Sequence, residues 1–194
     1  MKDNTFKFEY KLNNTQSIKN YIFNTFNKEN SFYEVVKKAV DLGYTEPDPK
    51  IDLCGIDVSR KILILARESG KKIEFSDVQN ISFLPDESIN TESKEEFLES
   101  IKNNNDHFNK MLDKALKNKS RLKYVASLID GKASVSLKEI NENHPFYNLQ
   151  GSDNITVFHT DRYKESPLVV KGAGAGGEFT ASGVFADIIK ASKK

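Results

Sequence analysis

Residues 122–137 read LKYVASLIDGKASVSL and carry the clearest fold signal in the chain. Two runs with alternating apolar residues, Leu122–Leu128 and Ala133–Leu137, flank the pair Asp130-Gly131. Asp-Gly between two such runs is a strong sign of a two-residue hairpin turn, because both positions tolerate positive φ. The stretch therefore predicts an antiparallel β-hairpin.

The segments that follow the hairpin predict more strands and one helix. We expect strands at Asn154–Thr160 and Pro167–Lys171, and a final helix capped by Thr180. The apolar positions of that helix are Val184, Phe185, Ile188 and Ile189. Strands are thus grouped in the second half of the chain rather than alternating with helices. This grouping favours an α+β fold, with a mixed β-sheet covered by helices on one face, over a doubly wound parallel sheet.

The segments before the hairpin are predominantly helical. A helix is expected from Ser17, a second between a Ser31 cap and a Gly43 stop, and a third over Ile56–Glu68. A long amphipathic helix is expected over Glu95–Lys119. The apolar stripe of the first helix is formed by Ile18, Tyr21, Ile22 and Phe26. Residues 1–16 predict only a poorly specified arm with a short strand at Phe6–Tyr10.

Composition limits the classes of protein to which the chain can belong. Its 194 residues are enough for one domain with a sizeable core plus an appendage. The 29 basic and 28 acidic residues leave a net charge of +1, so no nucleic-acid or membrane partner is expected. The single cysteine, Cys54, excludes an internal disulfide and is compatible with a reducing compartment. Without a secretory signal or an apolar run of about 18 residues, we expect a soluble, cytoplasmic protein.

The richest concentration of candidate functional groups is the segment Gly43–Lys61, GYTEPDPKIDLCGIDVSRK. Its prolines stiffen an acidic turn that precedes a helix and bias the residues before them towards extended geometry. Asp57 and Lys61 have the i,i+4 spacing of one helix face. Together with Glu46 and Asp52, they are predicted to converge on one polar pocket.

A purely structural interpretation of this segment also exists. Acidic residues near a helix start stabilise the helix dipole, and Asp57 with Lys61 would contribute only about 0.3–0.5 kcal/mol as a solvated pair. The position of Lys61 favours function, because it opens the apolar run Ile62–Ala66. A lysine at the edge of a buried helix either extends to solvent or is held among carboxylates in a cleft.

Other candidate motifs are weaker. The glycines of Gly172–Gly177 match G-x-G-x-x-G, but no second strand and acidic residue follow to complete a dinucleotide-binding unit. These glycines then serve a tight turn, or contact a phosphate or a neighbouring domain through backbone N–H groups. The histidines, His107, His144 and His159, lack partners at metal-ligand spacing, so no metal is expected. Cys54 has no flanking histidine and is assigned no chemistry.

Several motifs, taken together and in order, resemble the homoserine dehydrogenases. They are GYTEPDP at 43–49, Asp52-Leu53, Asp57-Val58, Arg60-Lys61, LARE at 65–68, SFLP at 82–85, DGKA at 130–133, HPFYNLQGSDN at 144–154 and KGAGAG at 171–176. The later motifs are most similar to the form fused to aspartokinase. The resemblance covers about residues 17–194 and divides the chain into an unmatched arm (1–16), a substrate-binding and dimerisation domain (17–160), and a glycine-rich turn with a terminal helix (161–194).

The resemblance implies NAD(P)-dependent interconversion of L-homoserine and L-aspartate 4-semialdehyde, on the route to threonine and methionine. It implies that Lys61 is the catalytic acid/base and that Glu46, Asp52, Asp57 and Tyr44 bind the substrate. Glu46 and Asp57 would hold its ammonium, and Asp52 would support the reacting hydroxyl and the lysine. The backbones of Gly43 and Gly176 would approach NADP or NAD. A homodimer formed through the β-sheet is also implied.

The chain departs from the family pattern at several points. The family carries an amino-terminal Rossmann domain and a second active-site lysine, and neither is recognisable here. A Gly-Thr pair of the family falls at Ser17-Ile18, while Ile51 and Cys54 replace residues that are often acidic and small polar, respectively. The alternative function is therefore a catalytically incomplete remnant that acts in oligomerisation or amino-acid binding. Weak or absent NADPH binding by a chain that dimerises would favour the remnant. Homoserine-dependent NADPH formation would favour the dehydrogenase.

Overall fold

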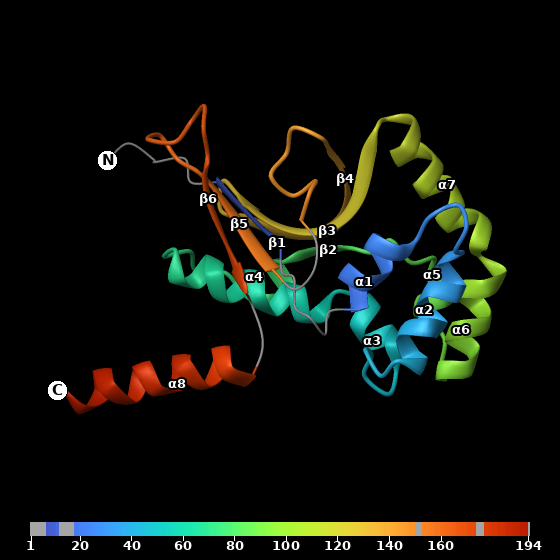
Figure 1. Cartoon of the computed structure of the whole chain (residues 1–194), viewed down its shortest axis with the longest axis horizontal. Helices are drawn as coiled ribbons and strands as arrows, with labels where there is room; N and C mark the ends of the chain where they lie inside the picture. Colours follow the sequence, from blue (N-terminus) through green and yellow to red (C-terminus); the bar gives the residue numbers. More distant parts are fainter. Residues whose placement is uncertain (1–6, 12–17, 150–152, 174–176, 194) are drawn as a thin grey trace.

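The computed structural model describes residues 7–11, 18–149, 153–173 and 177–193 as a mixed β-sheet with helices packed on one face (Figure 1). The sheet has six strands in the order β2-β4-β3-β1-β5-β6. The strands are β1 (Lys7–Lys11), β2 (Gln79–Ile81), β3 (Ser120–Ile129), β4 (Lys132–Asn141), β5 (Asp153–His159) and β6 (Leu168–Ala173). Neighbours are antiparallel except β2 and β4, which are parallel. The predicted α+β class with a mixed sheet is confirmed.

The helices form two layers over the sheet. They are α1 (Ile18–Thr25), α2 (Phe32–Asp41), α3 (Pro49–Leu53), α4 (Ile56–Glu68), α5 (Asp86–Ile89), α6 (Lys94–Asn103), α7 (Asn105–Lys117) and α8 (Gly177–Ser192). Helices α1, α4 and α7 pack on β3, while α2 packs on α1, α6 and α7. Helix α8 extends away from this body at the carboxyl end of the chain (Figure 1). No helix within the described ranges is both long and apolar enough to cross a membrane.

The predicted hairpin forms the centre of the sheet. Strands β3 and β4 pair in register from Ile129 with Lys132 to Ser120 with Asn141. Between them Asp130 and Gly131 both have positive φ, 51° and 79°. These values match the requirement of a two-residue hairpin turn for left-handed backbone at both positions. The hairpin prediction is confirmed.

Strand β1 lies inside the sheet, between β3 and β5. Phe8 pairs with Leu128 on one side and with Phe158 on the other. The expected short strand is therefore present as Lys7–Lys11, and it is an integral part of the sheet rather than a segment of a loose arm. The remaining residues of the predicted arm lie outside the described ranges, and the proposed domain boundaries stay a prediction.

The two faces of the sheet bury separate apolar clusters. On the helical face, Tyr124 and Leu128 of β3 join the large cluster formed with α1, α2, α4, α6 and α7. Val125, which alternates with Tyr124, points to the opposite face. There it packs with Phe146 and Leu149, from the segment that follows β4. The hairpin is thus covered on both sides, which explains why β3 is buried along most of its length.

The residues predicted to begin and end α2, Ser31 and Gly43, are confirmed. The Ser31 hydroxyl accepts a hydrogen bond from the Glu34 N–H (3.2 Å), and the Glu34 carboxylate accepts one from the Ser31 N–H (2.8 Å). This reciprocal arrangement is a capping box. At the other end Gly43 has φ 70°, and the Tyr44 N–H donates to the Ala39 carbonyl (2.9 Å). The chain therefore leaves α2 in a fixed direction, into the acidic segment.

Three local predictions were wrong. The long helix expected over Glu95–Lys119 is broken at Asn104, whose side-chain amide donates to the Ser100 carbonyl and competes with the helical backbone. The last helix begins at Gly177, so Thr180 lies inside it and cannot cap it. The acidic turn is not extended throughout, because Pro49 starts the short helix α3, where its missing N–H has no cost.

Candidate active site

The acidic turn between α2 and α4 is held by two of its own aspartates. Asp48 caps α3, with its carboxylate accepting a hydrogen bond from the Lys50 N–H (2.9 Å). Asp52 reaches back along the turn and accepts one from the Glu46 N–H (2.8 Å). Its position in α3 therefore fixes the backbone that carries Glu46. Tyr44 is anchored on the other side by an edge-on contact with Tyr21, with ring centroids 5.3 Å apart.

The start of α4 packs directly against the sheet. Gly55 precedes the helix with φ 84°, and a Cβ at this position would lie 2.0 Å from the Tyr124 hydroxyl. Asn80 donates a hydrogen bond from its side-chain amide to the Cys54 carbonyl (2.7 Å). Only glycine satisfies both the backbone angle and the close approach. The first turn of α4 is consequently placed by contacts with β2 and β3.

Asp57 and Lys61 lie on α4 and contact each other. The Lys61 ammonium lies 2.9 Å from the Asp57 carboxylate, as the i,i+4 spacing predicts. The Lys61 side chain is 33% exposed, against 65% for Asp57, so the lysine is the more enclosed partner. The Lys61 side chain is thus mostly covered but still partly open to solvent. Such a group is able to exchange a proton with a bound molecule.

The pKa of Asp52 depends on the other charged groups around the acidic turn. Burial raises the pKa of Asp52, and the nearby carboxylates of Glu46 and Asp57 raise it further. The Glu46 N–H and the Lys19 ammonium act in the opposite direction. Asp52 therefore lies within electrostatic reach of both Glu46 and Asp57. Glu46 itself is exposed at the edge of the group.

Lys19 was missed by sequence reasoning. Its side chain is only 5% exposed, and its ammonium lies 4.7 Å from the centroid of the Tyr124 ring. A signal existed, because Ile22, Phe23 and Phe26 follow at i+3, i+4 and i+7 and are all buried. Lys19 thus occupies the inward face of α1. We name Lys19, Glu46, Asp52, Asp57 and Lys61 the lysine–carboxylate cluster.

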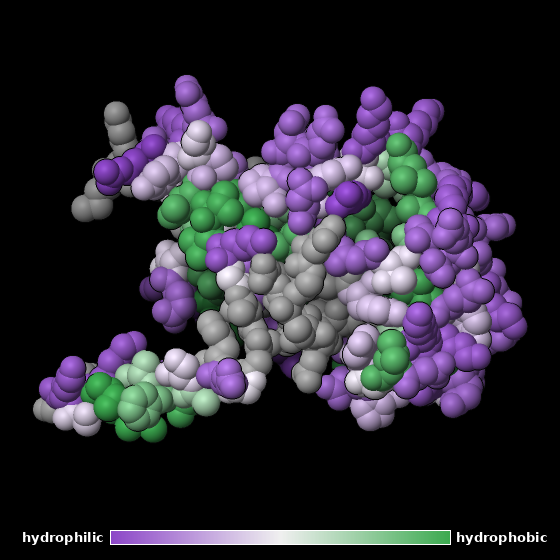
Figure 2. Space-filling view, viewed as in Figure 1, coloured by the Kyte–Doolittle hydropathy of each residue, from purple (hydrophilic) through white to green (hydrophobic). Residues whose placement is uncertain are grey.

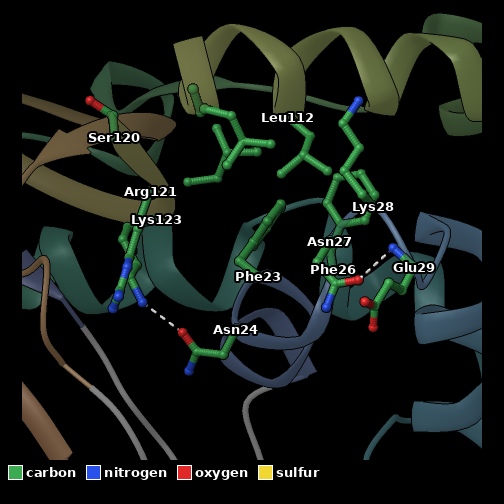
Figure 3. A pocket seen from close by; sticks show the side chains of 13 residues that line it. Phe23, Asn24, Phe26, Asn27, Lys28, Glu29, Leu112, Ser120, Arg121 and Lys123 are labelled. Carbon is green, nitrogen blue, oxygen red and sulfur yellow. Dashed lines mark hydrogen bonds between the residues drawn. The ribbon is translucent and has the colours of Figure 1, made fainter. Parts of the chain in front are cut away.

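A hollow of the described surface lies elsewhere. It has a volume of about 750 Å³ and opens between α1, α7 and the start of β3 (Figure 3). Within it Lys123 donates a hydrogen bond to Asn24 (2.6 Å), and no member of the lysine–carboxylate cluster lines it. The gathering of charged groups, rather than this hollow, makes the lysine–carboxylate cluster the candidate site.

The glycines expected at the cofactor are only partly described. Gly43 has open space where a Cβ would project, so its backbone is accessible to a bound molecule. Gly176 lies outside the described residues. Helix α8 follows β6, and β6 pairs antiparallel with β5, so these described elements do not form a βαβ unit. No grouping of three or more metal-ligating side chains occurs among the residues that the structure describes.

Comparison with known proteins identifies the family of the chain. A sequence model described as homoserine dehydrogenase matches residues 3–189. The chain belongs to the homoserine dehydrogenase family. Among relatives, the chloroplastic bifunctional aspartokinase/homoserine dehydrogenase 2 of Zea mays is 43% identical over 172 residues, which are 88% of this chain and 19% of that protein. The homoserine dehydrogenase of Schizosaccharomyces pombe is 41% identical over 178 residues, 88% of this chain and 47% of that protein.

Solved structures agree with the family assignment. A homoserine dehydrogenase from S. aureus superposes with a TM-score of 0.72 at 25% identity, covering 98% of this chain and 43% of that one. A Candida auris protein of unknown function superposes with a TM-score of 0.87 at 38% identity, covering 100% and 55%. In sequence, this homoserine dehydrogenase-family chain spans less than half the length of each of the two curated relatives, those from Zea mays and S. pombe. The match from residue 3 includes β1.

Proposed function

We propose that the chain is the substrate-binding and catalytic part of an NAD(P)-dependent homoserine dehydrogenase, which interconverts L-homoserine and L-aspartate 4-semialdehyde. The observation that carries the proposal is the contact between Lys61 and Asp57 beside the partly buried Asp52. A substrate with an ammonium and a reacting hydroxyl needs convergent carboxylates and one cationic proton donor. The lysine–carboxylate cluster contains both.

Each member has a separate role in this proposal. Glu46 and Asp57 hold the substrate ammonium, with Asp57 also in contact with Lys61. Asp52 supports the hydroxyl and the turn. Lys61, as the neutral amine, takes the hydroxyl proton while a hydride leaves the carbon that bears the hydroxyl, which gives the aldehyde and the Lys61 ammonium. In the reverse direction Lys61 returns the proton to the aldehyde oxygen, where negative charge develops.

The cofactor is proposed to be NADP or NAD, which accepts the hydride when bound. The open space beside Gly43 is compatible with a nicotinamide cofactor passing over the end of α2. Most cofactor contacts are expected from residues beyond those described, because the described glycines form no dinucleotide fold. Within this chain, Gly43, Gly176 and the start of α8 are proposed to form one edge of the cofactor site.

The exposed apolar surface at β6 is proposed to form a homodimer interface. Leu168, Val169 and Val170 are 43%, 40% and 55% exposed on β6, which stands at one end of the strand order of the described sheet. Figure 2 shows apolar groups gathered over this end of the sheet and along α8. Clustered apolar exposure of this kind marks interaction surfaces.

We further propose a cytoplasmic setting, which suits the lone free cysteine. We also propose a place in threonine and methionine synthesis.

Removing the charge of Glu46 is expected to weaken substrate binding. Glu46→Gln keeps the size of the side chain but replaces a charge-assisted hydrogen bond by a neutral one. Homoserine affinity should fall by about 1.5–3 kcal/mol, measured by isothermal titration calorimetry. Glu68→Gln is the matched control, because this exposed glutamate lies at the far end of α4. Equal affinity in wild type and Glu46→Gln would remove Glu46 from the proposed site.

The activity itself is tested by homoserine-dependent formation of NADPH or NADH. The absorbance of the reduced nicotinamide is followed with L-homoserine and either oxidised cofactor. We expect formation that requires homoserine and is absent with L-serine, whose hydroxyl is one carbon closer to the ammonium. Dimerisation and homoserine binding without any cofactor reduction would instead favour the binding-module alternative.

A further inference from the structure

Lys50 is a lysine of the acidic turn whose charge is directed away from the carboxylates around it. Glu46, Asp48 and Asp52 all lie within four positions of it in the sequence. The half-buried Lys50 side chain instead donates a hydrogen bond from its ammonium to the Thr91 carbonyl, 41 positions along the chain. Within the described residues this ammonium forms no ion pair with the three carboxylates. Their negative charge therefore stays available to a ligand.

The acceptor of this hydrogen bond belongs to the connection between α5 and α6, which is itself held by hydrogen bonds. The Thr91 hydroxyl donates to the Ser88 carbonyl (3.0 Å). The Ser88 side chain is buried, and its hydroxyl lies 2.8 Å from the Ser100 hydroxyl of α6. The Thr91 carbonyl therefore has a fixed position, against which Lys50 can hold α3.

Helix α3 needs a directional contact because its apolar contacts fix only one face. Its buried residues are Pro49 and Leu53, which are four positions apart and form a single stripe. Apolar burial is non-directional, so it determines the rotation of the helix about this stripe only weakly. The bond from Lys50 to Thr91 sets that rotation, and with it the direction in which Asp52 leaves the helix.

Asp52 transmits the orientation of α3 to the backbone that carries Glu46. The Asp52 carboxylate accepts the 2.8 Å hydrogen bond from the Glu46 N–H. Within α3 the Lys50 carbonyl accepts a hydrogen bond from the Cys54 N–H (2.9 Å), so Lys50 and Asp52 lie in the same closed turn. Every step from Thr91 to Glu46 is thus a hydrogen bond or the short backbone of α3.

We propose that Lys50 is a positioning residue that orients α3, so that Asp52 holds the backbone of Glu46 in place for the substrate. The same bond to Thr91 keeps the Lys50 charge off the carboxylates of the turn. The inference rests on the proposed function, because Glu46 is assigned there to the substrate ammonium. Lys50 touches no substrate atom in this scheme, so its loss should act on substrate binding and not on proton transfer.

Calorimetric titration with L-homoserine tests the effect on binding, and the sign of the effect is decisive. Lys50→Met removes the bond to Thr91 and should weaken affinity roughly three- to tenfold, because Glu46 occupies the binding geometry for less of the time. A lysine that acts only through its charge predicts the opposite sign, since removing a cation favours the binding of an ammonium. Lys50→Arg keeps a charged donor and should bind nearly as wild type does. Unchanged or tighter binding by Lys50→Met would overturn the inference.

Two further variants show whether the effect passes through Glu46. Lys38→Met removes an exposed lysine from the last turn of α2 without touching α3, and it should not weaken binding. In a Glu46→Gln background, Lys50→Met should cause a smaller loss of affinity than it does in wild type, because the charge that it positions is already gone. Equal losses in the two backgrounds would show that Lys50 does not act through Glu46 and would overturn the inference.

Hydrogen exchange of the Glu46 amide tests the structural step without a ligand. Measured by NMR on isotope-labelled chain, this amide should exchange roughly three- to tenfold faster in Lys50→Met than in wild type, and Lys50→Arg should preserve its protection. The amide of Ile62, in the core, should be unchanged, which would show that the variant is folded. Equal exchange of the Glu46 amide in Lys50→Met and wild type would overturn the inference. If wild type binds no homoserine, the proposed function fails, and this exchange still decides whether Lys50 holds the turn.

Discussion

Replacing Lys61 with alanine is expected to lower kcat for homoserine oxidation by about 10²–10⁴-fold, the usual contribution of a positioned acid/base. KM for homoserine should change far less, because Glu46, Asp52 and Asp57 remain to bind the substrate. The structural reason is the position of Lys61, which is 33% exposed and lies 2.9 Å from the Asp57 carboxylate. Steady-state kinetics in both directions would separate the two parameters.

The control for this variant is one residue away. Arg60 is exposed on the same turn of α4, so Arg60→Ala removes an equal charge without touching the cluster. We expect near wild-type kcat for Arg60→Ala. If Lys61→Ala retained wild-type kcat, Lys61 would not be the proton-transfer group. A large rise in KM with unchanged kcat would assign it to substrate binding instead.

Replacing Gly55 with alanine is expected to have the largest effect on stability, lowering the free energy of unfolding by about 2–5 kcal/mol. One part of this cost is the backbone, since φ is 84° and left-handed geometry disfavours any side chain. The other part is the clash, because the new methyl group would lie 2.0 Å from the Tyr124 hydroxyl. Chemical denaturation measures the change. The start of α4, which carries Asp57 and Lys61, would have to shift.

A matched glycine separates the two contributions. Gly70 has nearly the same φ, 82°, but nothing lies within 4 Å of a Cβ added there. Gly70→Ala should therefore cost only the backbone strain of about 1–2 kcal/mol. Tyr124→Phe removes the clashing hydroxyl, so it should partly rescue Gly55→Ala. Equal losses for Gly55→Ala and Gly70→Ala would show that the contact with Tyr124 does not constrain the helix.

The parts of the fold that the sequence predicted are those encoded by neighbouring residues. The Ser31 cap, the Gly43 stop and the Asp130-Gly131 hairpin each depend on backbone preferences within a few positions. The contact of Asp57 with Lys61 follows from helix periodicity alone. These local rules were sufficient to place the acidic turn before α4 and to expect a sheet with one helical face.

The parts that the sequence could not predict depend on distant partners. The place of strand β1 inside the sheet, unlike its presence, is defined by pairing with residues 126–129 and 155–159, far along the chain. Helix α3 needed the prolines to be recognised as a helix start, rather than as breakers of regular structure. Lys19 was overlooked because a lysine is normally assigned to the polar face of a helix, and its burial depends on Tyr124 of β3.

The central claim is that the lysine–carboxylate cluster recognises the ammonium and the hydroxyl of homoserine. The most direct measurement is calorimetric titration of the chain with L-homoserine and with 4-hydroxybutyrate, which keeps the hydroxyl and lacks the ammonium. We predict saturable binding of homoserine that Glu46→Gln weakens, much weaker binding of 4-hydroxybutyrate, and no effect of Glu46→Gln on the latter. Equal binding of the two ligands, or homoserine binding that Glu46→Gln leaves unchanged, would contradict the account.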